Sequence, residues 1–328
     1  MPIVNFYCTN CGSILEEIKS GLSCSTCMVD YPKYLDIVDL RFPRPIFTPK
    51  NLTRINEMID QYKQLTFSDL LNIFLREAQL SENVLEQTNT YYQQQDIRSE
   101  KMTGMLIEKS ENYFGSVSQG VAIDLGCGSG GGTEALSRRF EWVYGVDSDL
   151  AQLILAKKYL QERHVNNVTL ICAFTQKLPF GENVFSFAQG INIIEHLEEN
   201  LSDSFQEIKR CLKLGGVFVA DSRNRFDVFM PEPHSGIRFL GFLPRKVTTR
   251  LVRKVTGNHY QNTQLISYRE LRRAICTNFD NYKIALPDIR AYGKSDNVEK
   301  WISSLKSNAC FTRLLLSVIS AQIVVAKK

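Results

Sequence analysis

The sequence predicts a doubly wound α/β fold, with a mostly parallel sheet of seven strands and a small cysteine-rich module at the N-terminus. The first observation behind this prediction is the alternation of short apolar segments with segments of helical periodicity from about residue 120 onward. Such alternation is typical of parallel sheets whose strands are joined by crossover helices. The second observation is a pair of Cys-x-x-Cys motifs within the first 45 residues.

Length and composition are consistent with this organisation. The 328 residues suffice for one large domain and an appendage, and 44% hydrophobic with 23% charged residues is an ordinary globular composition. The net charge of +4 is too small to predict nucleic-acid binding by itself. Four of the nine cysteines form two tight pairs, which favours metal binding in a reducing compartment over disulfides. No leader or membrane-spanning apolar run is recognised, so we expect a cytoplasmic protein without a transmembrane segment.

Residues 1–45 are expected to form a compact module. Cys8 and Cys11 are separated by twelve residues from Cys24 and Cys27. Four thiolates at this spacing suit a closed, tetrahedral zinc site, and a site of this type couples metal binding to folding. A redox pair or chance spacing is the alternative interpretation.

Residues 46–115 are expected to be helical and to form a linker or lid before the main domain. Leu65, Leu70 and Phe74 belong to an apolar stripe at helical spacing. A polar, Gln-rich stretch follows at 91–96.

The main domain is expected over residues 116–328. A helix with Leu201, Phe205 and Ile208 on its apolar face should follow the fourth strand and stop at the glycine pair 215–216. An insert over 223–265 separates the fifth strand from a helix that opens with the capping box 267–270. The seven expected strands are 121–125, 142–146, 168–173, 184–191, 217–220, 283–286 and 321–326.

A glycine-rich loop follows the first strand of this domain. Asp124 ends the strand, and Gly126, Gly128 and Gly130 come after it. Glycines at this point let the backbone turn sharply and approach a ligand closely. A carboxylate directly before the glycines would repel a pyrophosphate but attract an ammonium group, and Asp147 at the end of the second strand is placed to accept both hydroxyls of a ribose. A dinucleotide site, which shares the glycine pattern, is the alternative.

Five motifs in a fixed order resemble those of class I S-adenosylmethionine-dependent methyltransferases. They are Val-Ala-Ile-Asp-Leu-Gly-Cys-Gly-Ser-Gly at 121–130, Gly-Val-Asp at 145–147, Leu-Pro-Phe at 178–180, Asn-Ile-Ile-Glu-His at 192–196 and Leu-Lys-Leu-Gly-Gly at 212–216. The resemblance covers roughly residues 95–328 and implies S-adenosylmethionine as the cofactor.

The resemblance also implies the residues of a cofactor site. Many relatives carry Asp at the position of Phe174, where it would accept a hydrogen bond from the adenine amino group; a phenyl ring stacks on adenine but cannot accept that bond. The implied cofactor residues are Asp124, Leu125, Gly126, Cys127, Gly128, Gly130, Asp147, Ser148, Ala173, Phe174, Gly190, Ile191 and Asn192.

The N-terminal module resembles the small zinc ribbons that are fused to, or partnered with, several methyltransferases. Leu-Ser-Cys-Ser-Thr-Cys at 22–27 and the acidic segment 30–39 carry this resemblance. Some such relatives act on ribosomal or transfer RNA and others on small molecules. The ribbon therefore supports methyl transfer without choosing the acceptor.

Glu195 and His196 are the candidate catalytic residues. An acceptor hydroxyl has to lose a proton during methyl transfer, and His196 next to the cofactor-facing turn is the best-placed base. A structural role, in which the pair caps the following helix or orders the loop, is the alternative. A quinone O-methyltransferase subgroup holds a metal with an additional Glu at the position of Asn192, so the resemblance does not imply catalytic magnesium here.

The insert is expected to contact the acceptor through Arg223, Asn224, Arg225 and His234, although an ordered surface loop is the alternative. Residues 238–254 contain six basic and no acidic side chains. Val247, Leu251 and Val255 are expected on one helical face, beside a basic one. Such a helix could contact an anionic membrane or grip phosphates.

These observations predict a methyltransferase that acts on a small-molecule or lipid- or sugar-linked acceptor. An RNA methyltransferase is the alternative enzyme, but residues 1–45 hold four basic and five acidic side chains rather than a basic surface. A non-catalytic, cofactor-binding scaffold is the other alternative.

Overall fold

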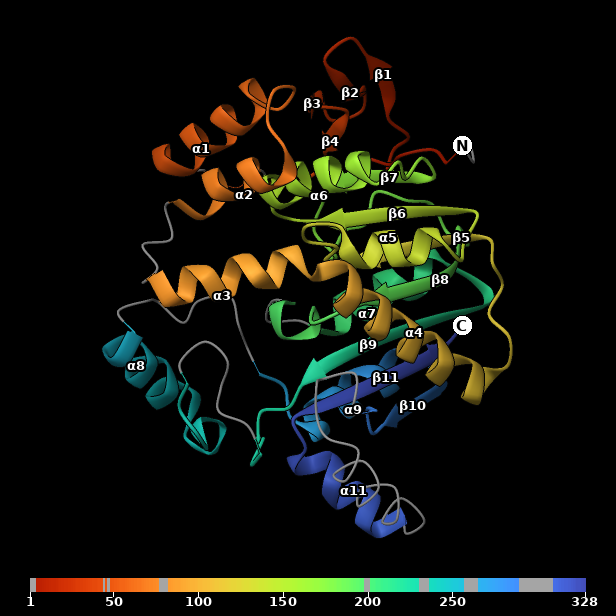
Figure 1. The fold of residues 1–328 in the computed structure, drawn as a ribbon. Coiled ribbons are helices and arrows are strands. Elements are labelled where there is room, and N and C mark those ends of the chain that lie inside the picture. The colour runs from red at the N-terminus through yellow and green to blue at the C-terminus, as the bar shows by residue number, and fades with distance from the viewer. Residues whose placement is uncertain are drawn as a thin grey trace.

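The computed structural model describes residues 4–328 except for 44, 46–47, 77–81, 198–200, 230–235, 257–264 and 289–308. A twisted sheet forms the centre of the molecule (Figure 1). Seven of its strands have the order β7-β6-β5-β8-β9-β11-β10. The first five in this row are parallel, whereas β11 is antiparallel to both of its neighbours. These strands are β5 (Val121–Leu125), β6 (Trp142–Asp147), β7 (Val168–Cys172), β8 (Phe185–Gly190), β9 (Leu212–Arg223), β10 (Asn281–Ala285) and β11 (Ala321–Lys327).

The whole sheet is larger than the seven strands that the sequence predicts, and it is mixed. It has eleven strands, because four N-terminal strands continue it beyond β7. β4 lies parallel to β7, with Val38 opposite Ile171 and Asp39 opposite Cys172. This pairing satisfies backbone groups that an edge strand would leave open. The added strands are β1 (Glu16–Ile18), β2 (Gly21–Cys24), β3 (Val29–Tyr34) and β4 (Ile37–Asp39).

Helices cover both faces of the central strands. On one face, Leu106 of α4 and Leu136 of α5 pack with Phe187 of β8. On the other, Phe205 of α7 packs with Phe218 of β9. The helices of the first face are α4 (Gln95–Phe114), α5 (Gly131–Ser137) and α6 (Leu150–Glu162), and those of the second are α7 (Leu201–Cys211) and α9 (Tyr268–Asn278).

The chain between β4 and β5 is helical, and three helices precede α4 in it. Phe67 and Leu71 of α2 join α6 in one buried cluster. The capping box of Thr66 and Asp69 fixes the start of α2. The three helices are α1 (Pro49–Asp60), α2 (Phe67–Leu75) and α3 (Glu82–Gln93).

The start of α9 agrees with the sequence prediction, whereas the end of α7 does not. The capping box of Ser267 and Glu270 opens α9 as predicted. The glycine pair 215–216, in contrast, does not stop α7; the helix ends at Cys211 and β9 begins at the next residue. A glycine with φ of +77° at position 215 thus bends the start of a strand rather than ending a helix.

The described chain also contains the turns η2 (Ile194–His196) and η3 (Leu240–Phe242) and the helices α8 (Arg245–Thr256) and α11 (Ala309–Val318). In the part of the chain that the structure describes, no helix combines the length and the apolar character needed to cross a membrane.

Candidate functional site

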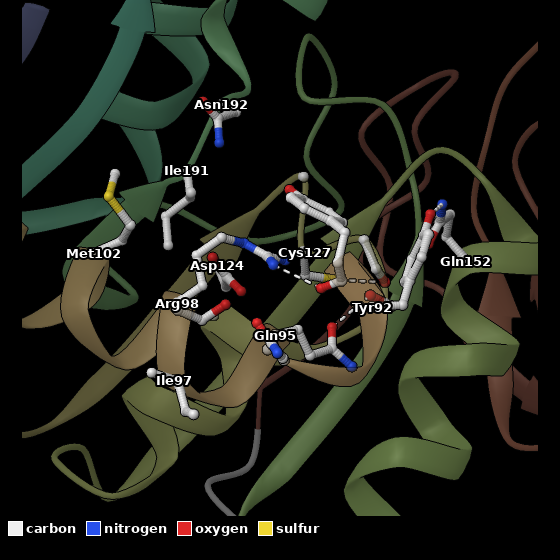
Figure 2. Close-up of a pocket in the computed structure, with 18 of the residues that line it drawn as sticks. Tyr92, Gln95, Ile97, Arg98, Met102, Asp124, Cys127, Gln152, Ile191 and Asn192 are labelled. Carbon is white, nitrogen blue, oxygen red and sulfur yellow. Dashed lines mark hydrogen bonds between the residues drawn. The ribbon is translucent and has the colours of Figure 1, made fainter. Parts of the chain in front are cut away.

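A cavity of about 860 Å³ lies at the carboxyl ends of the parallel strands, where open α/β sheets bind their ligands. The glycine loop after β5 lines one part of it, and residues of α3 and α4 line another. In Figure 2, Tyr92 and Gln152 lie at one end of the cavity, and Met102, Ile191 and Asn192 lie at the other. The cavity is therefore lined by segments that are far apart in the sequence.

The glycine loop has the tight geometry that its sequence predicts. Gly126 and Gly128 have φ of +65° and +50°, in the left-handed region that favours glycine. A Cβ on Gly126 would lie 2.6 Å from Cδ1 of Ile193. A Cβ on Gly128 would meet only the Gln152 amide oxygen, at 4.0 Å. The backbone at Gly128 is thus open to the cavity.

Asp124 is buried in the lining of the cavity. Its Oδ2 accepts a hydrogen bond from the Thr133 hydroxyl at 2.8 Å, and its Oδ1 accepts one from Nε2 of Gln189 at 3.3 Å. Burial raises the pKa of Asp124 to about 6, although both hydrogen bonds oppose the shift. A cation placed against this carboxylate would lower its pKa again and would be bound in return.

Asp147 organises the loops around the cavity but is not part of the cavity lining. Its Oδ2 accepts the backbone N–H of Gly128 at 2.9 Å, and its Oδ1 accepts that of Asp149 at 2.8 Å. Burial raises its pKa above the usual value. Six of the sequence-predicted cofactor residues line the cavity: Asp124, Gly126, Cys127, Gly128, Ile191 and Asn192. The others, Leu125, Gly130, Asp147, Ser148, Ala173, Phe174 and Gly190, lie outside its lining.

Side chains of α3 and α4 that no sequence motif points to also line the cavity. Gln95 is 2% exposed, and its Oε1 accepts a hydrogen bond from the Ser129 hydroxyl at 2.6 Å. Its Nε2 is buried without a partner among the described residues. Gln152 donates through Nε2 to the Tyr92 hydroxyl at 2.9 Å, while its Oε1 is likewise unpaired there. The Gln-rich stretch at 91–96 was the available signal, but only the fold reveals that it faces the glycine loop.

Glu195 and His196 occupy different environments although they are adjacent in the 3₁₀ turn η2 (Ile194–His196). His196 lines the cavity and is exposed to it. Glu195 is buried, and its Oε2 has no hydrogen-bond partner among the described groups. Burial raises the pKa of Glu195 to about 7, and the negative charge of the nearby Asp221 contributes to the same shift to a lesser degree. Only the histidine is placed to contact a bound molecule.

The insert residues separate in the same way. Arg223, at the end of β9, lines the cavity. The Asn224 side chain is buried and donates to the carbonyl oxygen of Leu316 at 3.0 Å. Arg225 donates to the carbonyl oxygens of Gly241 and Leu243, in the η3 turn and just after it. The structure therefore directs Asn224 and Arg225 to internal contacts. His234, the fourth predicted acceptor residue, lies outside the described residues.

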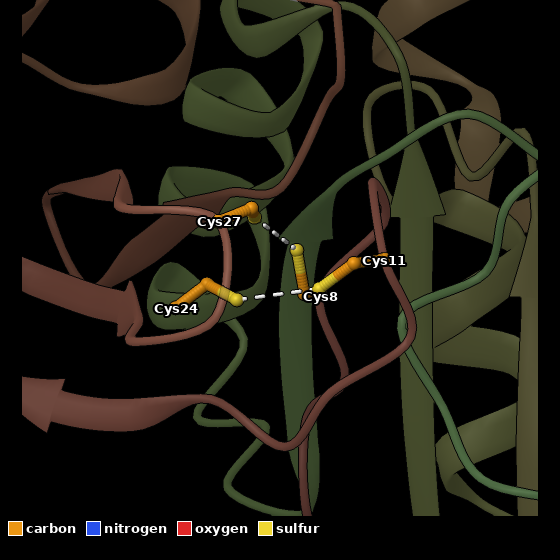
Figure 3. A group of neighbouring side chains, drawn as sticks. All are labelled: Cys8, Cys11, Cys24 and Cys27. Atoms are coloured by element: carbon orange, nitrogen blue, oxygen red, sulfur yellow. Dashed lines mark hydrogen bonds between the residues drawn. The ribbon is translucent and has the colours of Figure 1, made fainter.

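The four N-terminal cysteines converge as their spacing predicts (Figure 3). Their sulfur atoms all lie within 4.8 Å of one another, and all four thiols are free of disulfides. Sγ of Cys8 is 3.5 Å from Sγ of Cys27, and Sγ of Cys11 is 3.4 Å from Sγ of Cys24. Sulfurs about 2.3 Å from a tetrahedral zinc ion are about 3.8 Å apart. This donor set therefore fits zinc.

A short chain of contacts joins the cysteine cluster to the loops around the cavity. The Thr9 hydroxyl, next to Cys8, donates to the carbonyl oxygen of Leu40 at 2.7 Å. The N–H of Leu40 in turn donates to the carbonyl oxygen of Cys172, at the end of β7. Arg41 follows, and its Nη1 donates to the carbonyl oxygen of Ser148 at 2.9 Å. Ser148 adjoins Asp147, so the N-terminal module supports the loop after β6.

Comparison with protein families agrees with the glycine-loop motifs. Residues 123–220, which run from β5 to β9, match the family described as a methyltransferase domain. This match, together with the order of the central strands, supports a class I methyltransferase fold.

One curated relative is an uncharacterized protein of Methanocaldococcus jannaschii, 30% identical over 128 residues. The match covers 39% of this chain and 50% of the relative, so the chain spans half the length of the curated relative that it matches.

Similar solved structures include phosphoethanolamine N-methyltransferase 2 of Haemonchus contortus, with a TM-score of 0.47 and 15% identity over 80% of this chain and 60% of that chain. Geranyl diphosphate C-methyltransferase of Streptomyces coelicolor has a TM-score of 0.42 and 20% identity, covering 67% of this chain and 76% of that one. Likenesses at this level assign no substrate.

Proposed function

We propose that the protein is an S-adenosylmethionine-dependent methyltransferase that acts on a small anionic acceptor, free or linked to a lipid or a sugar. The observation that carries this proposal is the combination, in one cavity, of an open glycine backbone, a buried carboxylate at the strand end and a buried amide donor that has no partner among the described residues. The methyltransferase-domain match over 123–220 supports the same activity.

The cavity offers complementary groups for the cofactor. Asp124 would attract the ammonium group of the methionyl part, directly or through water, and Nε2 of Gln95 would donate to its carboxylate. Gly128 would let the cofactor lie directly against the backbone. Asp147 would hold the ribose hydroxyls after the side chains of Tyr92 and Gln152 move aside. These two side chains are hydrogen-bonded to each other at one end of the cavity. When bound, the sulfonium supplies an activated methyl group.

The acceptor side of the cavity favours a negatively charged molecule. Arg98, Lys101 and Arg223 line the cavity, whereas Asp124 supplies the only carboxylate among the described lining residues. The guanidinium carbon of Arg98 lies 3.4 Å from the ring centroid of Tyr91, and its Nη1 donates to the Tyr91 carbonyl oxygen. An anionic acceptor would thus meet an ordered cation. His196 would accept the proton of an acceptor hydroxyl.

The N-terminal cysteines would hold a structural zinc ion. Four thiolates leave no open coordination position, so this ion would take no part in methyl transfer. Its role would be to fold the module that carries β4 and Arg41 against the loop after β6.

Titration calorimetry with S-adenosylmethionine tests the proposal on the full chain and two matched variants. Gly128→Ala places a methyl group in the cavity, and we expect at least a tenfold weaker cofactor affinity, about 1.4 kcal/mol. Gly236→Ala is the control. Position 236 also has a positive φ, +69°, a Cβ there would meet nothing within 4 Å, and the change should leave binding unchanged.

The outcomes separate the candidate functions. Absence of cofactor binding by the folded wild-type chain would exclude the enzyme. Cofactor binding without methyl transfer to any fraction of a cell extract, followed with labelled methyl donor, would leave a non-catalytic scaffold. Labelled RNA in that experiment would replace the small acceptor by a nucleic acid.

A further inference from the structure

Four large apolar side chains are exposed on one part of the surface, outside the cavity. Phe239 and Phe242 are 55% and 53% exposed, and Leu243 and Val247 are 37% and 44% exposed. The first three belong to the η3 turn and its flanks, and Val247 lies in the first turn of α8. We call these four residues, together with the outward face of α8, the α8 surface.

The turn holds these side chains outward by specific contacts. Arg225 donates through Nε to the Gly241 carbonyl oxygen at 2.9 Å and through Nη2 to the Leu243 carbonyl oxygen at 3.1 Å. Any Cβ at Gly241 would lie 1.6 Å from the backbone oxygen of Arg225, so the two segments are in direct contact. Leu240 is buried and anchors the turn. The exposed rings are therefore displayed by an ordered turn.

Phe239 carries a further sign that the turn is held in place. Its φ is +59°, a left-handed conformation that bulky residues rarely adopt. Such a conformation persists only where the surrounding structure enforces it. The turn therefore presents Phe239 to solvent although both its backbone conformation and the exposure of its apolar ring are energetically unfavourable.

The helix that follows has a basic outward face. Val252 is buried, which fixes the inward side of α8. The sequence predicts Val247, Leu251 and Val255 on one apolar face, but Val247 is exposed and lies on the outward side; the side chain of Val255 is outside the described residues. Lys246, Arg250 and Lys254 are exposed and, at helical spacing, share this outward side with Val247.

Charge on this segment has one sign. Residues 238–254 contain six basic side chains and no acidic one. Arg245 forms an ion pair with Glu270 at 2.6 Å, which ties the base of the helix to α9. The remaining basic residues of the helix face outward with Val247. A partner that covers this surface must therefore offer both apolar and negatively charged groups.

We propose that the α8 surface docks on the anionic face of a lipid bilayer. A basic helix preceded by exposed phenylalanine and leucine matches the pattern of proteins that lie in the membrane interface. Aromatic rings alone could stack on the bases of an RNA, but Leu243 and Val247 would gain nothing from stacking. The two aliphatic side chains thus favour acyl chains, and the cations favour anionic headgroups.

The position of the surface agrees with this role. Figure 1 shows α8 at the periphery of the molecule, on the side towards which β9 runs. β9 ends at the cavity residue Arg223, so the cavity and the α8 surface lie on the same side. Docking would bring the cavity towards the bilayer. The docking proposal itself does not rest on methyltransferase activity.

Vesicle co-sedimentation of the full chain tests the charge component. Vesicles of phosphatidylglycerol and phosphatidylcholine in equal parts should bind the wild-type chain, and pure phosphatidylcholine much less. Each cation near an anionic surface contributes about fivefold to binding. The triple variant K246E/R250E/K254E should therefore bind at least about 100-fold more weakly. The matched control K19E/K63E/K213E reverses three exposed lysines of other segments and should retain most of the binding.

A second variant tests the apolar component without altering charge. F239S/L243S/V247S leaves Phe242 in its contact with Phe226, whose ring centroid lies 5.2 Å away. This variant should bind the mixed vesicles at least about tenfold more weakly. The control L52S/L214S/L314S changes three exposed leucines elsewhere and should behave as wild type. Circular dichroism should show that all variants keep the same fold.

Three outcomes would overturn the proposal. The wild-type chain would fail to bind the mixed vesicles, or the charge-reversal variant would bind them as the wild type does, or both triple controls would lose as much binding as the α8 variants. Binding of a single-stranded RNA oligonucleotide, abolished by the same α8 variants and without vesicle binding, would assign the surface to nucleic acid. Cofactor binding, measured in parallel by calorimetry, should be unchanged in every α8 variant.

Discussion

The guanidinium of Arg41 donates to the backbone carbonyl oxygen of Ser148 across 107 positions of sequence, at 2.9 Å. The same guanidinium forms a buried, two-pronged ion pair with Asp39, through Nε at 2.8 Å and Nη2 at 2.6 Å. Asp39 lies in β4, which is paired with β7. The N-terminal module is thereby tied to the loop after β6, which adjoins the cavity.

Replacement of Arg41 by alanine should destabilise the whole chain. It leaves the Asp39 carboxylate buried and unpaired, and breaking a buried pair in this way costs about 3–5 kcal/mol. Urea unfolding measures this loss. Arg76→Ala, which removes an exposed ion pair with Glu57, is the control and should cost less than about 1 kcal/mol. Equal losses in the two variants would contradict a supporting role for Arg41.

Arg41→Lys separates support of the loop from charge. Lysine retains the positive charge but cannot reproduce the planar fork that reaches both Asp39 and Ser148. We expect S-adenosylmethionine to bind several-fold more weakly while most of the stability is kept. Unaltered affinity would show that the contact with Ser148 is irrelevant to the cofactor.

Cys24→Ser should abolish metal binding by the N-terminal cluster. The buried Cys24 thiol is one of the four proposed ligands, and a structural zinc site of this kind contributes to folding directly. Elemental analysis should find about one zinc per wild-type chain and none in the variant, and the Tm should fall by about 10 °C or more. Cys276→Ser, an exposed thiol outside the cluster, should leave both values unchanged.

Glu195 should make the stability of the protein fall as the pH rises. Its pKa is raised from 4.5 to about 7 in the folded chain, so the folded state holds a proton that the unfolded state has lost. The associated stabilisation is complete below pH 4.5 and is lost by about pH 7. At about 1.36 kcal/mol per pKa unit it amounts to about 3 kcal/mol.

Urea unfolding at pH 5 and pH 8 checks this expectation. Glu195→Gln should show a smaller difference between the two pH values than the wild type. A part of the difference should persist, because burial also raises the pKa of Asp124, to about 6. Glu108→Gln, an exposed position on α4, is the control. An unchanged pH dependence in Glu195→Gln would contradict the assignment.

His196→Gln should reduce methyl transfer by about 100-fold or more if the acceptor is a hydroxyl. The side chain lines the cavity, and glutamine keeps polarity without a comparable base. Cofactor affinity should be unchanged. His164→Asn, on the surface at φ of +56°, is the control because asparagine tolerates that conformation. Full activity in His196→Gln would leave the histidine a structural role.

Local pattern was enough to predict strands of the central sheet and the course of the glycine loop. The alternation of apolar segments with helical ones placed strands at 121–125 and 321–326 close to the observed bounds. The left-handed conformations of Gly126 and Gly128 were predictable, because glycine allows the sharp turn that a strand-to-helix connection needs. The spacing of the cysteines likewise predicted their convergence, because each Cys-x-x-Cys turn brings its two thiols together.

Pairing between distant segments could not be predicted from local sequence pattern. Nothing in residues 37–39 specifies that they add to β7, because any short apolar strand can pair with an open edge. The Gln-rich stretch at 91–96 was visible, but which of its side chains enter the cavity depends on how α4 packs on α5. Arg223 and Arg225 are two residues apart, and only the fold sends one to the cavity and the other to the η3 turn.

The sequence by itself determined local elements: the seven strands of the main domain, the glycine bend, the capping box of α9 and the four-cysteine donor set. Each depends on interactions among residues that are neighbours in the chain. The tertiary structure alone decided the eleven-stranded sheet, the reach of Arg41 to Ser148, the lining of the cavity by residues of α3 and α4, and the outward display of Phe239. These depend on contacts between distant segments, whose partners are selected by the packing of the whole chain rather than by any local pattern.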